Sequence, residues 1–209
     1  MQGRRMGFTA FGGRALTVLG CTTLMLLISV DGASAQRRVA PDSIRTLQQV
    51  EPLHGPPGTV VTIYTENLPL QARVHVGVGA TRAGFEALDE AEQAMYGEVS
   101  ATLTIPETAP WDRAVLLVAF DANFAPIGFS DPFHVTRQDG ILRRTGTVTD
   151  EGVECIAMRD TDDFLYTLIG NTEGLEPGQS AVIEGRYMEA STCMQGTTIQ
   201  VERVLPPPS

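Results

Sequence analysis

Short apolar runs separated by turn residues extend through most of the 209-residue chain. Between positions 51 and 135, five runs have strand character, because they either alternate apolar with polar residues or stay apolar throughout. Clusters of glycine, proline and asparagine lie between them and favour turns. Short strands at this spacing predict a β-sandwich. The five runs are residues 59–65, 73–78, 99–105, 114–120 and 133–136.

A second series of five apolar runs follows, with turn residues at 161–163 and 176–179. Five short strands with one longer connection are typical of an OB-like barrel. We therefore predict an all-β chain, in which an Ig-like β-sandwich is followed by a small five-stranded OB-like barrel. The five runs of the second series are residues 142–149, 154–159, 164–169, 180–188 and 197–204.

Residues 84–96 (GFEALDEAEQAMY) do not share the strand pattern. Their composition favours a helix, and Phe85, Leu88, Ala91 and Met95 fall at helical spacing. We expect a short helix, or a long loop across one end of the sandwich. The four acidic residues of this segment match the spacing of no calcium-binding loop, so a solvated face is expected.

Residues 1–35 have the layout of a secretory signal peptide. Three arginines precede an apolar run at 16–30, and Ala33-Ser34-Ala35 supplies the small residues that a signal peptidase needs. The alternative is a retained membrane anchor, but the run is shorter than the roughly 20 residues that span a bilayer. We expect cleavage before Gln36, no transmembrane anchor afterwards, and a periplasmic or extracellular protein.

Cys21 leaves an alternative to this cleavage open. Residues 18–21 (VLGC) loosely resemble a lipobox, in which the cysteine is acylated and becomes the new first residue. The apolar run continues beyond Cys21, whereas lipid-modified cysteines usually follow such a run. A lipoprotein anchored at Cys21 is therefore the minor alternative.

Export also predicts the redox state of the two remaining cysteines. An even pair in an oxidising compartment favours one disulfide, between Cys155 and Cys193. The alternatives are two buried free thiols or a metal site, and two cysteines without a nearby histidine cannot fill a tetrahedral zinc shell.

The chain is acidic, with a formal net charge of −10. Without residues 1–35 it holds 12 arginines and 24 acidic residues. Such a chain repels nucleic acid, which needs a basic face to release counterions, and lacks the basic patch that binds anionic membranes. We expect no nucleic-acid partner.

No residue pattern in the chain demands a reaction. Asp160, Asp162 and Asp163 are the best metal candidates, but they fail the pattern of a calcium loop, so a solvated turn is favoured. No serine lies in the G-x-S-x-G context of a hydrolase, and no glycine-rich nucleotide loop follows a strand. We predict no catalytic residue, no metal site and no cofactor. The three histidines, His54, His75 and His134, share no metal-site or triad spacing.

Residues 50–63 (VEPLHGPPGTVVTI), followed by Asn67 and Leu68, resemble the opening of an IPT/TIG immunoglobulin-like domain. That family begins with a proline, a G-x-x-G turn, a T-V-T-I strand and an N-L turn, and Glu66 stands where a glycine is usual. The resemblance covers about residues 50–136. It implies a sandwich with a spacer, adhesion or binding role, and no active-site residues.

Residues 147–201 resemble a small OB-like barrel family of unknown function in secreted bacterial proteins. The shared features are an E-G-V-E-C start, an L-Y-T-L strand and a C-M-Q-G-T-T-I ending. The resulting domain plan is a signal peptide at 1–35, a linker at 36–49, a sandwich at 50–136, a barrel at 140–204 and a tail at 205–209.

These observations favour an exported, non-enzymatic binding or interaction protein of the cell envelope. An envelope protein or a glycan is the partner class expected. The alternatives are a structural component of an envelope assembly and an enzyme with an unrecognised site.

Overall fold

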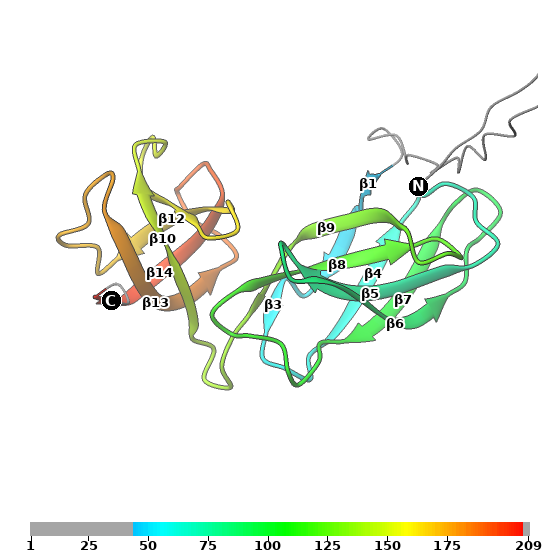
Figure 1. Cartoon of the computed structure of the whole chain (residues 1–209). Helices are drawn as coiled ribbons and strands as arrows, with labels where there is room; N and C mark the ends of the chain where they lie inside the picture. Colours follow the sequence, from blue (N-terminus) through cyan, green and yellow to red (C-terminus); the bar gives the residue numbers. More distant parts are fainter. Residues whose placement is uncertain (1–43, 207–209) are drawn as a thin grey trace, which may run out of the picture. The chain divides into compact units, whose positions relative to one another are not determined.

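The computed structural model describes residues 44–206, so the predicted signal peptide and Cys21 lie outside the described residues. The described residues form fourteen strands and no helix, and none of them belongs to a helix long and apolar enough to cross a membrane. The all-β prediction is confirmed, and both an Ig-like sandwich and an OB-like barrel are present (Figure 1).

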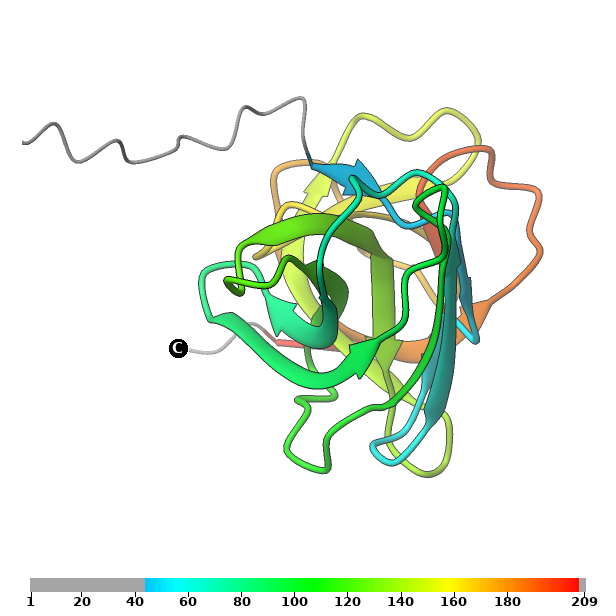
Figure 2. The same ribbon diagram turned by 90° about the vertical axis from the view of Figure 1, so that its right-hand side faces the viewer.

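Two sheets form the sandwich, and they lie on opposite sides of one core (Figure 2). In the larger sheet the order is β1-β9-β8-β5-β6, and β3 also pairs with β9. The smaller sheet has the order β2-β4-β7. The strands are β1 (Arg45–Thr46), β2 (Gln49–Glu51), β3 (His54–Gly55), β4 (Val60–Thr65), β5 (Val74–Ala80), β6 (Gly84–Ala91), β7 (Val99–Thr104), β8 (Ala114–Phe120) and β9 (Pro126–Val135).

Alternating side chains of both sheets meet in the core of the sandwich. Val61 and Ile63 of β4 are fully buried, whereas Val60 and Thr62, which alternate with them, face outward. Leu117 and Phe133 from the larger sheet pack in the same cluster. The period-two burial explains why the sequence pattern located these strands well.

The expected helix or loop at residues 84–96 is wrong. Residues 84–91 form β6, which pairs antiparallel with β5 from Val74↔Ala91 to Ala80↔Gly84. Pairing with β5 satisfies the backbone of a segment that is helical only by composition, since strand propensity depends strongly on context. β6 is an edge strand with exposed Glu86, Asp89 and Glu90, and such charges discourage pairing with another chain.

The predicted linker at residues 36–49 also needs adjustment. β1 pairs parallel with Gly128 and Phe129 of β9, and Gln49 of β2 pairs with Tyr64 of β4. The ordered sandwich therefore begins at Arg45, within the segment expected to be a linker. Its polar sequence gave no strand period because these two strands have only two and three residues.

Five strands close the barrel in the order β10-β11-β12-β14-β13, with β13 pairing back onto β10. β12 and β14 form the one parallel pair of this ladder. Met158, Tyr166, Ile183 and Ile199 are fully buried and fill the core. The strands are β10 (Leu142–Thr149), β11 (Ile156–Asp160), β12 (Leu165–Gly170), β13 (Ser180–Met188) and β14 (Thr197–Leu205).

Two glycines allow the barrel strands to approach closely. A Cβ atom at Gly146 of β10 would lie 2.1 Å from the carbonyl oxygen of Arg159 in β11. A Cβ atom at Gly185, beside the bulge in β13, would lie 2.2 Å from the carbonyl oxygen of Gln200. Any side chain at these positions would push the paired strands apart, so the closed barrel requires glycine there.

Candidate functional site

The face on which OB barrels usually bind ligands is covered in this chain. That face is formed by the second and third strands, with the loops after the first and fourth strands. Here the strands are β11 and β12. Ala157 and Thr167 alternate with core residues and so face outward, yet they are only 0% and 1% exposed. Something must therefore cover them.

The covering element includes residues 189–196, the loop after β13. Ser191 Oγ lies 2.6 Å from Thr198 Oγ1 on β14, and Thr198 Oγ1 lies 2.9 Å from Thr167 Oγ1 on β12. The backbone N–H of Cys193 donates to Ser191 Oγ at 3.1 Å. This chain of hydroxyl groups fixes the loop, which we call the cover loop, against the outer face.

The predicted disulfide between Cys155 and Cys193 is present, with a Cα–Cα distance of 5.8 Å. Cys155 ends the loop after β10, and Cys193 lies in the middle of the cover loop. The bond therefore joins the two loops that in other OB barrels close around a ligand. It holds the cover loop in place, so a binding site must be sought elsewhere on the described residues.

The sandwich and the barrel share a buried polar junction centred on Arg144 of β10. Arg144 is fully buried at an inward-facing position two residues after Leu142. Its guanidinium donates to the hydroxyl of Tyr166 at 3.0 Å and to the backbone carbonyl of Trp111 at 3.2 Å. It also lies 3.3 Å from Nδ1 of His134 in the sandwich strand β9. One cation thus contacts groups from both folds.

His134 is the sandwich side of this junction. Its Nε2 atom lies 3.3 Å from Thr197 Oγ1 of β14, and its ring stacks on Tyr187 with centroids 5.3 Å apart. Burial, reinforced by the neighbouring Arg144 charge, holds the pKa of His134 well below its usual range. The imidazole is therefore neutral at physiological pH.

Asp160 and Tyr166 complete the charge arrangement in the barrel. Burial raises the pKa of the Asp160 carboxyl, although backbone N–H groups of Phe164 and Asp162 donate to its Oδ1 atom at 2.9 Å. Burial likewise raises the pKa of Tyr166 to about 12. The Tyr166 hydroxyl therefore stays protonated and neutral beside Arg144.

A second polar contact ties the two folds through Arg113 and Asp162. Arg113 Nε and Nη2 donate to Asp162 Oδ2 and Oδ1, each at 2.6 Å. The Asp162 side chain is only 2% exposed. The hydrogen bonds to Asp162 raise the pKa of Arg113. Bidentate geometry with a buried carboxylate is the strong form of such a pair.

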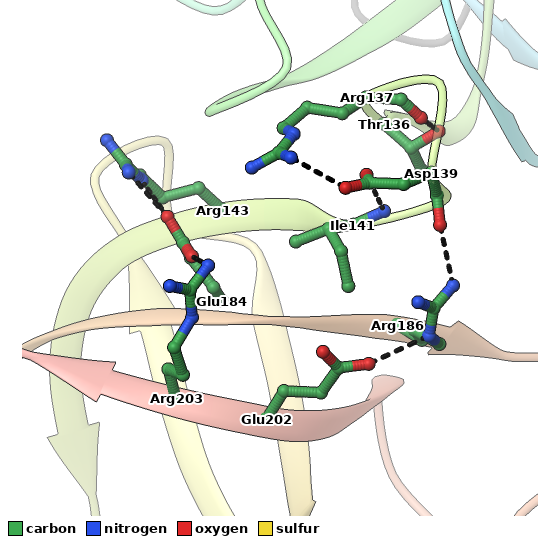
Figure 3. Close-up of polar contacts among 9 residues, drawn as sticks. All are labelled: Thr136, Arg137, Asp139, Ile141, Arg143, Glu184, Arg186, Glu202 and Arg203. Atoms are coloured by element: carbon green, nitrogen blue, oxygen red, sulfur yellow. Dashed lines mark hydrogen bonds and ion pairs between the residues drawn. The ribbon is translucent and has the colours of Figure 1, made fainter.

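A third network lies around the connection between the folds (Figure 3). Glu184 of β13, with a side chain 3% exposed, accepts hydrogen bonds from both Arg143 and Arg203. The Arg143 guanidinium lies 4.5 Å from the centre of the Trp111 ring. Arg186 donates to Glu202 at 2.8 Å and to the backbone carbonyl of Asp139 at 2.7 Å. Arg186 thus ties the connection between β9 and β10 to the barrel, and Arg143 of β10 contacts Trp111 of the sandwich.

An open groove of about 930 Å³ lies beside this junction. The side chains that line it come from β2, from the β2–β3 connection, from the outer face of β4 and from the end of β13. Tyr64, Thr62 and the exposed Val60 supply the β4 wall, and Tyr187 with Glu189 supplies the barrel wall. We call it the junction groove; its remaining lining residues are Gln49, Val50, Glu51, Pro52, Leu53 and His54.

Several polar groups of the junction groove contact one another or a neighbouring side chain. His54 stacks on Tyr187 with ring centroids 4.5 Å apart, and its Nε2 atom lies 3.8 Å from Glu189. Burial, with Glu189 adding to it, raises the pKa of Tyr187. The Tyr64 hydroxyl donates to Glu66 at 2.6 Å, and this bond raises the pKa of Tyr64 to about 12. Glu189 is also the first residue of the cover loop.

The fold separates most of the sequence candidates for chemistry, but it brings His54 and His134 together. Asp162 binds Arg113, Asp163 lies 3.4 Å from Arg159, and Asp160 accepts two backbone N–H groups. No group of three or more potential metal ligands occurs among residues 44–206. His54 and His134 are register partners on the parallel strands β3 and β9, and both rings stack on Tyr187. The His75 ring stacks on Phe124 with centroids 4.4 Å apart.

Sequence reasoning missed the residues that matter most at the junction. The sequence pattern places Arg144 and Glu184 only within strands. Arg144 lies where the alternation of β10 predicts burial, whereas Glu184 lies opposite Arg143 on the other face from the core residue Ile183. A charged residue at an inward-facing position was the available signal, because a buried charge requires partners. No protein-family model matches this chain, and no curated protein matches it.

Proposed function

We propose that the chain is an exported, non-enzymatic binding protein that holds its partner in the junction groove. The observation that carries this proposal is the groove itself, an open hollow with two tyrosines, a histidine and two carboxylates in its lining. Open clefts that combine apolar and convergent polar side chains are the usual places for ligands.

Two features favour the junction groove as the binding site and disfavour the outer face of the barrel. The cover loop lies on the outer face of β12 and β14, and the Cys155–Cys193 disulfide holds it there. The junction behind the groove is densely hydrogen-bonded, so the two walls keep a fixed spacing. A preformed site loses less conformational entropy on binding.

The resemblances noted in the sequence fit this role. We infer that residues 50–136 are an IPT/TIG-like module and residues 140–204 a member of the secreted OB-like barrel family. Neither family supplies a catalytic residue. The disulfide is typical of an oxidising compartment and so supports export.

A structural role in an envelope assembly is the second candidate. The network around Arg144 favours it, because a stiff connection between two folds suits a spacer. Such a component should co-purify in a complex of fixed stoichiometry, whereas a binding protein should exchange its partner.

Site-specific photocross-linking in the exported fraction of the native host tests the proposed function. A photoreactive residue replaces Val60, which is 59% exposed in the groove, or Val153, which is 80% exposed in the loop before Cys155. We expect a discrete, saturable cross-link at Val60 and none at Val153. A second substitution, Thr62→Trp, fills the groove and should remove the cross-link. Equal cross-linking at both positions, or a cross-link that survives Thr62→Trp, would overturn the proposal.

A further inference from the structure

We infer that the junction groove takes a cationic partner, an extended peptide segment that carries arginine or lysine. This inference rests on the proposed function and adds the chemistry of the ligand. Glu51 and Glu189 contribute carboxylates to the groove, and none of the residues that line it is an arginine. The surface potential there therefore favours a positive group.

The acidic lining continues beyond the groove. A second hollow of about 500 Å³ shares Val60 with it and extends over β7 toward β6. Asp89 and Glu107 line this hollow, again without an arginine. Carboxylates thus lie on both sides of Val60, which suits an extended ligand with several cationic groups better than a single small ion.

The carboxylates of the two hollows form no ion pair with an arginine, and Glu189 lies 3.8 Å from the His54 Nε2 atom. Seven acids elsewhere each form an ion pair with an arginine: Glu90, Asp139, Glu151, Asp162, Asp163, Glu184 and Glu202. Among residues 44–206, no ion pair joins Glu51, Glu107 or Glu189 to an arginine. The carboxylates of Glu51, Glu107 and Glu189 therefore have no arginine partner among the described residues and can pair with a cationic ligand.

The rest of the lining fits the other parts of such a peptide. The Tyr64 ring and Val60 provide a surface for the aliphatic stem of a long cationic side chain. The outward-facing Thr62 and Thr102 place hydroxyl groups along the same face, where they can bond peptide groups. A neutral glycan would use the tyrosines and hydroxyls but would gain nothing from the carboxylates.

Fluorescence anisotropy with labelled ten-residue peptides on the full exported chain tests this inference. One peptide alternates arginine with threonine, and matched peptides carry glutamine or glutamate in place of arginine; an unlabelled neutral oligosaccharide serves as competitor. We expect binding of the arginine peptide only, weakening as salt rises, because exposed ion pairs are screened. Glu51→Gln and Glu189→Gln should each weaken it by about threefold, and together by about tenfold.

Glu173→Gln and Glu176→Gln are the matched controls, since both acids are exposed on the barrel and line neither hollow. These two substitutions should leave the affinity for the arginine peptide within about twofold of that of the unsubstituted chain. Equal losses in groove and control variants would show attraction to net charge alone and overturn the inference. Binding of the glutamine peptide at equal strength, or displacement by the oligosaccharide, would overturn it too.

The two proposals fail in different ways. If the cross-link at Val60 disappears with Thr62→Trp but persists in Glu51→Gln/Glu189→Gln, the groove binds a partner that is not cationic. If no cross-link forms at Val60 and no peptide binds, the groove is not the site and both proposals fall. The emission of Trp111, the one tryptophan of the chain, should be unchanged in the four glutamate-to-glutamine variants, which shows that the junction remains folded.

Discussion

The guanidinium of Arg144 and the imidazole of His134 lie 3.3 Å apart, and both side chains are fully buried. Because arginine can only donate hydrogen bonds, Nδ1 of His134 must be the acceptor. The ring proton therefore resides on Nε2, where it can be donated to Thr197 Oγ1. This tautomer joins a sandwich strand to two barrel strands through one neutral ring, and it makes the junction sensitive to protonation.

The free energy of unfolding should depend on pH through His134. Its folded pKa is depressed, while the unfolded value is about 6.5. Below pH 6.5, His134 binds a proton in the unfolded chain but stays neutral in the folded chain. The free energy of unfolding is therefore highest above that pH and decreases as the pH falls. The free energy of unfolding should change with pH by at most about 1.4 kcal/mol per pH unit through this one group. Urea unfolding between pH 7 and pH 5, followed by Trp111 emission, measures it.

His134→Asn is the control for this slope. The variant should be less stable at pH 7 but should lose the His134 component of the slope. Asp160 acts in the opposite sense, since its raised folded pKa gives stability below its unfolded value that is lost as pH rises. An unchanged slope in His134→Asn would contradict the assignment.

Replacement of Arg144 by methionine should destabilise the protein strongly. The change leaves the Tyr166 hydroxyl and His134 Nδ1 without their donor, and Asp160 without the nearby cation. We expect a loss of about 3 kcal/mol, typical of breaking a buried charged network. Arg186→Met removes an arginine whose side chain is 47% exposed in its pair with Glu202. That matched control should cost less than about 1 kcal/mol, and equal losses would show that Arg144 has no special role.

Arg113 and Asp162 should couple energetically across the two folds. Their bidentate contact predicts a coupling energy of about 2 kcal/mol in a double-mutant cycle with Arg113→Met and Asp162→Asn. Chemical denaturation of the four proteins gives the value. Additive effects of the two substitutions would mean that the contact contributes nothing in solution.

The disulfide should stabilise the chain and hold the cover loop. Its two cysteines are 38 positions apart, so the loop-entropy model gives about 4 kcal/mol. The Cys155→Ser/Cys193→Ser variant should unfold at correspondingly lower denaturant, and hydrogen exchange should rise in residues 189–196. If exchange in the cover loop stays at its original level, the hydroxyl contacts of Ser191 and Thr198 alone hold it.

The sequence predicted the strands whose burial has a clear period. Residues 114–120, 142–149 and 180–188 were located with their observed bounds, because alternation or a continuous apolar run follows directly from burial. The sequence did not predict β6, because its acids and alanines have the composition and spacing of a helix. The segment is a strand because it pairs with β5.

The candidate site was harder to predict for a physical reason. The junction groove combines β2 and β4 with the end of β13, residues more than a hundred positions apart. No local pattern encodes such a meeting. The pairing of Cys155 with Cys193 was predictable because it needs only two cysteines and an oxidising compartment, but its effect on the barrel face was not.

The position of Arg144 has a consequence for dividing the chain. A barrel expressed alone would hold, in β10, the Arg144 guanidinium without its partners Trp111 and His134. A sandwich expressed alone would expose an imidazole and a tyrosine-binding surface that it normally hides. We therefore expect each module to be less stable alone than in the pair, and an exchange of either one between proteins would have to carry its half of the junction with it.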